Sequence, residues 1–265
     1  MMVKLVVNGA AGRMGREVIG VAAANPDFAI VGGVVRPGSP LLGVDVGTQA
    51  GVGSLDIALT SDGNAALAGA NVAIDVSVPV SAVAFARLAS ERGVPAVVAT
   101  TGLSKEQLAE LDRLAERSAI LFAPNLSVGI NLLVQLLPSF VRALGDDYDI
   151  EVVESHHRRK KDAPSGTAIL LAEAIASALD HPLDDLERFG RHGISPRVPG
   201  EIGMHSLRMG GNPGEHHVFF ASEGEEIEVS HRALSRTTFA RGGIRAARWL
   251  AGKPPGRYSM MDVLR

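Results

Sequence analysis

A short apolar run followed at once by a glycine-rich turn constrains the fold of this chain more than any other feature. Residues 3–8, VKLVVN, are rich in valine and end at a glycine, which is typical of a buried strand. The turn GAAGRMG follows. Apolar residues at helical spacing then predict a helix over residues 13–24, which Asn25 and Pro26 end. A strand, a tight turn and a helix in direct succession predict a sheet with helices packed against it.

The same alternation continues through the first half of the chain. Further strands are predicted over residues 28–35, 71–77, 95–101 and 119–125, with helices over residues 80–92 and 105–117. Ser104 is expected to cap the second of these helices, with Gln107 three residues further on. Strands that alternate with helices predict an α/β fold, a Rossmann-type doubly wound parallel sheet over residues 1–127.

The pattern changes after Asn125. Helices are predicted over residues 129–144, 167–179 and 239–252, and strands over residues 148–155, 203–210, 215–222 and 225–233. Three strands in succession favour antiparallel pairing. We therefore expect a second, α+β domain with a mixed or antiparallel sheet over residues 128–236, with residues 237–265 returning to the first domain.

Composition excludes several classes of function. The 265 residues are 46% hydrophobic, which favours a folded core, and a net charge of −3 argues against general affinity for nucleic acid. The absence of cysteine excludes disulfides and thiolate chemistry. The start does not resemble a signal peptide, and no apolar stretch is long enough to predict a membrane span. We expect a soluble, cytoplasmic protein with no nucleic-acid or membrane partner.

The glycines of the first turn predict a dinucleotide site. Gly9, Gly12 and Gly15 form G-x-x-G-x-x-G between a strand and a helix, the context that this motif requires. Gly9 permits the turn, Gly12 lets backbone approach a pyrophosphate, and Gly15 allows close packing of helix on strand. The start of the helix then offers N–H groups and a partial positive charge to the phosphates.

The choice of cofactor should be readable at the end of the second strand. An acidic residue there would accept a hydrogen bond from the ribose of NAD, but the strand ends in Val35 and Arg36. Arg36 could instead meet a 2′-phosphate, so we expect NADPH in preference to NADH. Ligands of parallel sheets lie beyond the carboxyl ends of the strands, which also nominates the segments 75–79, 99–102 and 124–127. Within them, Thr100, Thr101, Asn125 and Ser127 are candidates to hold the nicotinamide ring and ribose.

A run of seven ionisable side chains lies in the stretch ESHHRRKKDAPSGTA, residues 154–168. A strand precedes the run and a helix start follows it, and this anchoring on both sides suits a binding site better than a solvated tail. The N–H groups of Gly166 and Thr167 at the helix start can receive a carboxylate. Lysine supplies a compact positive charge, and histidine titrates near neutral pH. The stretch therefore predicts a pocket for a small dianionic substrate.

Five stretches together resemble the 4-hydroxy-tetrahydrodipicolinate reductase (dihydrodipicolinate reductase) family: VNGAAGRMGREV, ESHHRRKKDAPSGTA, APNLSVGIN, VPGEIG and SHRALSRTTFARGGIRAARWL. The resemblance covers essentially the whole chain. It implies a Rossmann domain, a substrate domain that also builds a homotetramer, and reduction of the cyclic product of pyruvate and aspartate semialdehyde, with loss of water, in lysine biosynthesis. The alternatives are another two-domain amino-acid or aspartate dehydrogenase and a non-catalytic NADPH-sensing protein.

The resemblance also implies roles for individual residues. His156 is implied as the proton donor or acceptor and Lys160 as the proton donor, while His157, Gly166 and Thr167 are implied to bind substrate. The residues implied to bind cofactor, beside Arg36, are Gly9, Ala10, Ala11, Gly12, Arg13, Met14, Ala99, Thr100, Thr101, Pro124, Asn125, Leu126 and Ser127. Lys161 receives no role.

Two positions depart from the family pattern. Val35 stands where the family often has an acidic residue, which strengthens the expectation of NADPH, although many members use both cofactors. Ala99 stands where glycine is common.

The remaining polar strand residues are expected to play no part in the chemistry. Alternation along a strand places His216 and His217 on opposite faces, so we expect no metal site there. Asp149, Glu151 and Glu154 are expected to be polar positions at a strand edge.

Overall fold

The computed structural model describes residues 2–265, and their contacts divide the chain into two units. Unit 1 runs to Val128 and resumes at Arg236, and unit 2 comprises Gly129–Ser235. Met1, which the predicted first domain includes, lies outside the described residues.

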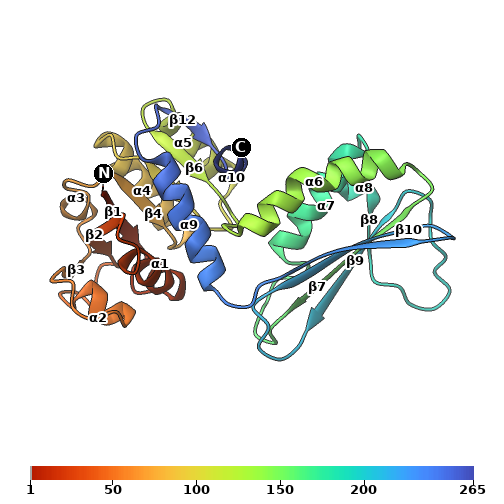
Figure 1. Ribbon diagram of the computed structural model, residues 1–265, viewed down its shortest axis with the longest axis horizontal. Helices are drawn as coiled ribbons and strands as arrows, with labels where there is room; N and C mark the ends of the chain where they lie inside the picture. Colours follow the sequence, from red (N-terminus) through yellow and green to blue (C-terminus); the bar gives the residue numbers. More distant parts are fainter. Residues whose placement is uncertain (1) are drawn as a thin grey trace. The chain divides into compact units, whose positions relative to one another are not determined.

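Unit 1 contains a seven-stranded sheet in the order β12-β6-β5-β4-β1-β2-β3, with parallel pairing throughout (Figure 1). The predicted Rossmann-type parallel sheet is thus confirmed. The strands are β1 (Val3–Asn8), β2 (Phe28–Val34), β3 (Leu59–Thr60), β4 (Val72–Asp75), β5 (Ala96–Val98), β6 (Ala119–Phe122) and β12 (Gly256–Tyr258). The helices are α1 (Arg13–Ala23), α2 (Val46–Ala50), α3 (Gly63–Ala66), α4 (Pro79–Glu91), α5 (Lys105–Ala115), α9 (Thr237–Leu250) and α10 (Met260–Leu264).

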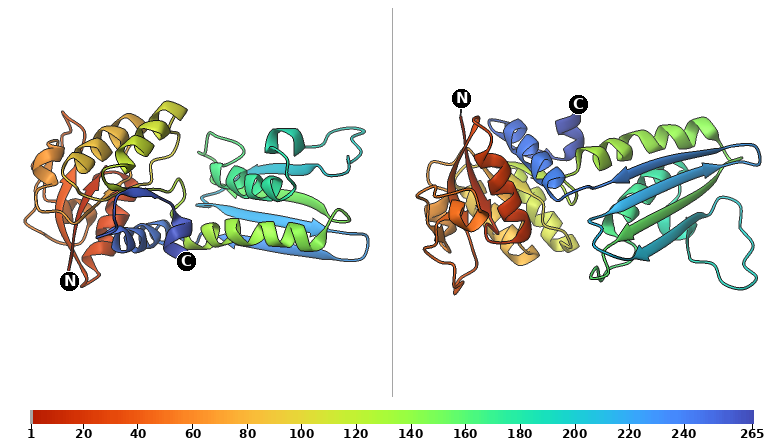
Figure 2. Two further views of the ribbon diagram at one scale, coloured as in Figure 1. Left: turned by 90° about the horizontal axis from the view of Figure 1, so that it is seen from above. Right: turned by 60° about the horizontal axis from the view of Figure 1, so that its bottom comes forward.

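Helices cover both faces of this sheet, because its apolar strands must be buried on both sides. Helices α1 and α9 lie side by side on one face, and α4 and α5 cover the other (Figures 1 and 2). Ser104 caps α5 in a capping box with Gln107, as the sequence predicts. Helix α9 belongs to unit 1 although it follows all of unit 2 in the chain.

Unit 2 contains a five-stranded sheet in the order β11-β10-β7-β9-β8. Its strands are β7 (Asp149–His156), β8 (Glu187–Phe189), β9 (Ile202–Arg208), β10 (Glu215–Ala221) and β11 (Glu226–Arg232). Its helices are α6 (Val128–Leu144), whose first residue still counts with unit 1, α7 (Gly166–Ala178) and α8 (Leu183–Leu186). Helices α6 and α7 pack on one face (Figures 1 and 2), and no helix among the described residues covers the other.

The expected antiparallel pairing of three successive strands is wrong for the first of them. Strand β7 lies between β9 and β10 and pairs parallel with β9, while β10 pairs antiparallel with β7 and β11. A parallel pair needs a crossover connection, and α7 lies within the one between β7 and β9. The segment between β9 and β10 wraps over the end of β7, where the His157 N–H donates to the Asn212 carbonyl at 2.9 Å.

Seven short helices and strands among residues 2–265 were not predicted, because two to five residues are too few to show the hydrophobic periodicity of a helix or a strand. They are α2, β3, α3, α8, β8, β12 and α10. None of the described helices combines the length and the apolar character needed to cross a membrane.

Two glycines of α1 allow a matched test of the packing of helix on strand. A Cβ at residue 15 would lie 2.2 Å from the Gly9 carbonyl oxygen, whereas a Cβ at residue 20 would have no neighbour within 4 Å. We expect Gly15→Ala to lower the free energy of unfolding by about 1–3 kcal/mol through overpacking. Gly20→Ala should instead raise it by up to about 1 kcal/mol through helix propensity. Urea unfolding followed by circular dichroism measures both, and equal stability of the two variants would contradict this packing.

Candidate active site

The residues predicted to bind cofactor gather at one edge of the sheet of unit 1. The parallel register aligns Asn8 with Asp75, Asp75 with Val98, and Val98 with Phe122. The glycine-rich turn and the segments 99–101 and 124–127 follow the last residues of β1, β5 and β6. They therefore leave the sheet at its carboxyl edge, where ligands of parallel sheets bind.

The turn after β1 depends on glycine and leads directly into the start of α1. Gly9 has φ of 79°, and a Cβ there would lie 2.8 Å from the Val76 carbonyl oxygen, so only glycine fits. Gly12 is the N-cap of α1 and offers no side chain, and the first turn of the helix holds no acidic residue. No acidic side chain in this first turn therefore neutralises the partial positive charge of the helix start. That charge is left to attract an anion such as phosphate.

The buried carboxylate of Asp75, the first residue of the nominated segment 75–79, connects the loops of this edge. Asp75 is 1% exposed and accepts hydrogen bonds from Asn8 Nδ2 at 2.7 Å and from the Ser77 and Thr100 hydroxyls at 2.5 Å each. Burial raises the pKa of Asp75, and the three donors oppose that rise. Because Thr100 is one of the predicted cofactor residues, Asp75 fixes the conformation of the segment that carries it.

The predicted cofactor residues differ in what they can offer a ligand. Arg36 is exposed in the loop after β2. Ala10 and Leu126 are buried in the core, so their side chains cannot reach a ligand and only their backbone can contribute. Gly242 of α9 packs so closely on this segment that a Cβ there would lie 1.8 Å from the Leu126 carbonyl oxygen.

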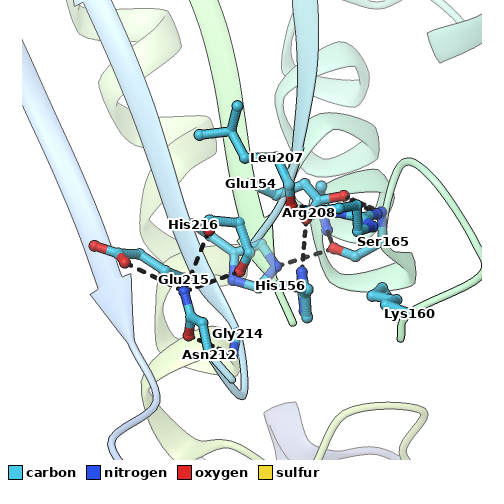
Figure 3. A network of polar contacts seen from close by, with 12 residues as sticks. Glu154, His156, Lys160, Ser165, Leu207, Arg208, Asn212, Gly214, Glu215 and His216 are labelled. Atoms are coloured by element: carbon cyan, nitrogen blue, oxygen red, sulfur yellow. Dashed lines mark hydrogen bonds and ion pairs between the residues drawn. The ribbon is translucent and has the colours of Figure 1, made fainter. Parts of the chain in front are cut away.

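In unit 2 the stretch 154–168 folds into the end of β7, a turn, and the start of α7. Polar side chains from β7, β9, β10 and the α7 N-terminus converge here on the sheet face that α7 covers (Figure 3). The group consists of Glu154, His156, Ser165, Arg208 and His216, with Lys160 nearby in the turn.

Glu154 is the centre of this group. It is fully buried, and its Oε1 accepts from the Ser165 N–H at 3.0 Å and Arg208 Nη2 at 2.6 Å. Its Oε2 accepts from Arg208 Nη1 at 2.8 Å and is 2.6 Å from His156 Nδ1. Burial raises the pKa of Glu154, but the hydrogen bonds from Arg208 and His156 outweigh it and bring the pKa to about 2. Glu154 is therefore a carboxylate at neutral pH, and every contact made to it must be a donor.

This requirement fixes the tautomer of His156. Nδ1 carries the proton that Glu154 accepts, which leaves Nε2 as the nitrogen that can exchange a proton with another group. Burial lowers the pKa of His156, and Glu154 opposes that shift, so the ring is neutral at neutral pH. Space at Nε2 depends on Gly214, because a Cβ there would lie 2.9 Å from that nitrogen.

Ser165 links the group to α7. Its Oγ caps the helix by accepting from the Ala168 N–H at 3.1 Å, and it is 3.0 Å from His216 Nε2. Burial, together with the positive charges near it, lowers the pKa of His216 to about 3, so this ring is neutral at neutral pH and shares a hydrogen bond with the Ser165 hydroxyl. The space beside Gly166 at the helix start is open.

Lys160 and His157 complete the predicted set in unit 2. Lys160 Nζ forms an ion pair with Asp162 at 2.7 Å, and both residues lie in the turn before α7. The Nδ1 of His157 is buried and makes no hydrogen bond within the part of the chain that the structure describes. A buried polar atom of this kind favours a ligand as its partner.

The prediction that Glu154 is a polar strand-edge position is wrong. In β7 the residues 150 and 152 are buried and apolar, and Glu154 follows in the same phase, so alternation places it on the covered face. This alternation was the feature of the sequence that could have predicted the burial of Glu154. A charged side chain at a position that alternates with buried apolar residues is itself buried and must be paired. Arg208 and His216 carried no comparable local signal, because their neighbours in space lie about 50 residues away in the chain.

Alternation on β10 behaves as predicted. His216 is 4% exposed on the covered face, whereas His217 lies on the opposite face and contacts Glu215 and Glu228.

Comparison with known proteins agrees with the resemblance drawn from the motifs. A family profile described as dihydrodipicolinate reductase, N-terminus, matches residues 3–126, and one described as dihydrodipicolinate reductase, C-terminus, matches residues 129–264. Among solved structures, a dipicolinate-bound dihydrodipicolinate reductase from Paenisporosarcina sp. TG-14 covers 100% of both chains with a TM-score of 0.78 at 23% identity, which supports the fold.

Curated relatives are more similar in sequence. Proteins named 4-hydroxy-tetrahydrodipicolinate reductase from Rubrobacter xylanophilus and Chromohalobacter salexigens are each 48% identical to this chain, and the matches cover 99% of it and 98% of each relative. The two profiles account for nearly every residue, and the relatives span both units. The chain therefore belongs to the dihydrodipicolinate reductase family.

Proposed function

We propose that this protein is a 4-hydroxy-tetrahydrodipicolinate reductase, which uses NAD(P)H to reduce its substrate to tetrahydrodipicolinate with loss of water. This step belongs to the diaminopimelate route of lysine biosynthesis. The observation that carries the proposal is the identity of 48% over nearly the whole chain to curated relatives of that name. Because the activity consumes a cofactor that the cell interior supplies, we place the enzyme in the cytoplasm.

Unit 1 is proposed to bind the cofactor. The residues of the glycine-rich turn, Gly9 to Met14, would hold the pyrophosphate at the α1 N-terminus, where no acid opposes it. The segments 99–101 and 124–127 would hold the nicotinamide side, with Asp75 keeping Thr100 in place. The cofactor, when bound, supplies a hydride to the ring of the substrate.

Unit 2 is proposed to bind the substrate. The N–H groups of Gly166 and Thr167 at the start of α7 suit one carboxylate, because Ser165 already caps the helix and leaves the space beside Gly166 open. His157 would give its buried Nδ1 a partner in the same ligand. A small dicarboxylate substrate is further supported by the solved relative, whose bound ligand is dipicolinate.

His156 and Lys160 are proposed to handle protons. Lys160 carries an ammonium group that can deliver a proton to the substrate position next to the reduced carbon. His156 presents Nε2 for proton exchange, because Glu154 holds the other nitrogen. One group is a cation and the other a neutral ring, so the site contains a proton donor and a proton acceptor at neutral pH.

We also propose a homotetramer built through unit 2. The outer face of its sheet bears Phe219 together with ionic pairs such as His205 with Glu151, and no helix among the described residues covers it. An uncovered sheet face on which apolar side chains such as Leu207 and Phe219 lie among charged ones favours association with a second copy. Light scattering that returns the mass of one chain would contradict this assembly.

The activity itself can be tested with substrate made in place. An upstream aldol enzyme supplied with pyruvate and aspartate semialdehyde provides it, and oxidation of NADPH is followed by absorbance. We expect oxidation that requires the upstream enzyme, and we expect Lys160→Ala to reduce kcat by about 100- to 10,000-fold, the range that general acid catalysis contributes. Binding of NADPH, measured by fluorescence, should not change in this variant.

The outcomes of this test are distinct. Bound NADPH without oxidation in the parent protein would refute the reductase activity and favour a sensing role. Rapid oxidation in both proteins would refute only the role of Lys160.

Arg36 tests the preference for NADPH. The guanidinium lies exposed after β2, where a 2′-phosphate would be recognised. Arg36→Ala should raise the KM for NADPH by about tenfold, the effect of losing one charge-assisted hydrogen bond, and leave the KM for NADH unchanged. Steady-state kinetics with both cofactors measure this, and equal effects on the two would rule out the phosphate contact.

Glu154 tests the positioning of His156. In Glu154→Gln the imidazolium loses its anionic partner, so the pKa of His156 should fall further below its ordinary value. The amide N–H₂ of glutamine would also donate to Nδ1, moving the ring proton to Nε2. Nitrogen NMR of the ring reports both changes, and kcat should fall by at least about tenfold, as for other residues that orient a reactive histidine.

The matched control is Glu151→Gln on the same strand, which changes an acid of the opposite face that contacts His205 and Arg197. It should leave the His156 signals as they are. A His156 tautomer that is the same in Glu154→Gln as in the parent would refute the positioning role even if activity is lost.

A further inference from the structure

A groove in unit 1 concentrates positive charge far beyond what the composition suggests. It lies between α1 and α9, which run side by side (Figure 2), and encloses about 1030 Å³. Its lining holds a single acidic residue, Glu17, and six arginines: Arg13, Arg16, Arg236, Arg241, Arg245 and Arg248. The chain as a whole carries a net charge of −3 with 26 basic residues, so this clustering is local.

The arrangement follows from the helix repeat. Arg241, Arg245 and Arg248 are spaced by four and three residues and so lie on one exposed stripe of α9. Arg13 and Arg16, three residues apart, form a facing stripe on α1. Two basic stripes on neighbouring helices therefore face the same groove.

Few of these charges are neutralised. Among the ion pairs of residues 2–265, the one that involves this set joins Arg248 to Asp27 at 2.7 Å. Glu17 accepts a hydrogen bond from the Thr237 hydroxyl at 3.0 Å. The other five guanidinium groups have no ion-pair partner within residues 2–265, and a bound anion would supply the missing counter-charge.

The size and floor of the groove indicate the kind of anion. Sites for small molecules enclose roughly 300–1,000 Å³, so the volume matches a metabolite. Val21, Phe28 and Ile244 line the groove with apolar atoms between the charges. Guanidinium groups bind phosphate through two parallel hydrogen bonds, and several of them favour a ligand with several phosphates.

We propose that the groove between α1 and α9 binds a small polyanion that carries several phosphate groups. The groove is built from residues of unit 1, whereas the proposed substrate pocket is built from residues of unit 2. Of the six arginines, only Arg13 also belongs to the proposed cofactor site. Arg241 and Arg245 lie on α9, outside the glycine-rich turn.

The test uses inorganic triphosphate as the probe and the full-length protein. Isothermal titration calorimetry at physiological ionic strength, where weak surface charge effects are screened, should show one site per chain. The double variant Arg241→Ala/Arg245→Ala should weaken binding by roughly 100-fold, since each guanidinium supplies a charge-assisted contact. The control Arg117→Ala/Arg142→Ala removes two exposed arginines elsewhere and should bind as the parent does.

Three results would overturn the proposal. Binding seen only at low ionic strength would mean nonspecific attraction to a basic surface. An equal loss in the control variant would mean that net charge, not the groove, holds the anion. A matching loss of NADPH affinity in Arg241→Ala/Arg245→Ala would assign these arginines to the cofactor site, and this result does not depend on whether the enzyme reduces the proposed substrate.

Discussion

The buried carboxylate of Glu154 is the interaction on which the architecture of unit 2 depends. It has lost its water, and a buried charge is tolerated only when donors surround it. The donors come from three places in the chain: Arg208 on β9, the Ser165 backbone at the α7 N-cap, and the ring of His156 on β7 itself. One side chain thus joins the strand pairing, the helix start and the histidine proposed to react. Removing Arg208 would leave the Glu154 charge without a cation, and removing either neutral donor would leave one of its oxygens with an unmet hydrogen bond.

Unit 1 also contains a buried acid, Asp75, but only neutral groups donate hydrogen bonds to it. Asp75 sits at the carboxyl edge of the parallel sheet and is held by an amide and two hydroxyls instead of by a cation. Burial accordingly raises the pKa of Asp75, whereas Arg208 helps to bring the pKa of Glu154 to about 2. The two carboxylates show how the same group can be used to fix loops in one unit and to fix a tautomer in the other. In both cases the acid contacts a residue that is proposed to contact the ligand, Thr100 in unit 1 and His156 in unit 2.

The sequence predicted the parallel sheet, its glycine-rich turn and most long helices, because these depend on local periodicity and on turn chemistry. Ser104 and Gln107 capped α5 as expected. Strand order in unit 2 could not be read locally, since β7 enters between β9 and β10 only through a crossover and a wrapped loop. Glu154 was misjudged although its phase in the strand indicated burial. The roles of Arg208 and His216 could not be predicted from local sequence. Arg208 contacts Glu154 on the neighbouring strand, and His216 contacts Ser165 at the α7 N-cap.

The discontinuity of unit 1 has a consequence for how the chain folds as it leaves the ribosome. The α9 residues Ala240, Ile244, Ala247 and Leu250 belong to the core that also contains β1 and α1, yet they are translated after all of unit 2. Until then, the part of the sheet face that α9 covers in the folded unit has no cover. Unit 2, whose residues 129–235 are contiguous, has all its core residues before that point. During synthesis, all residues of unit 2 are therefore available for folding before the last helix of unit 1 can pack on its sheet.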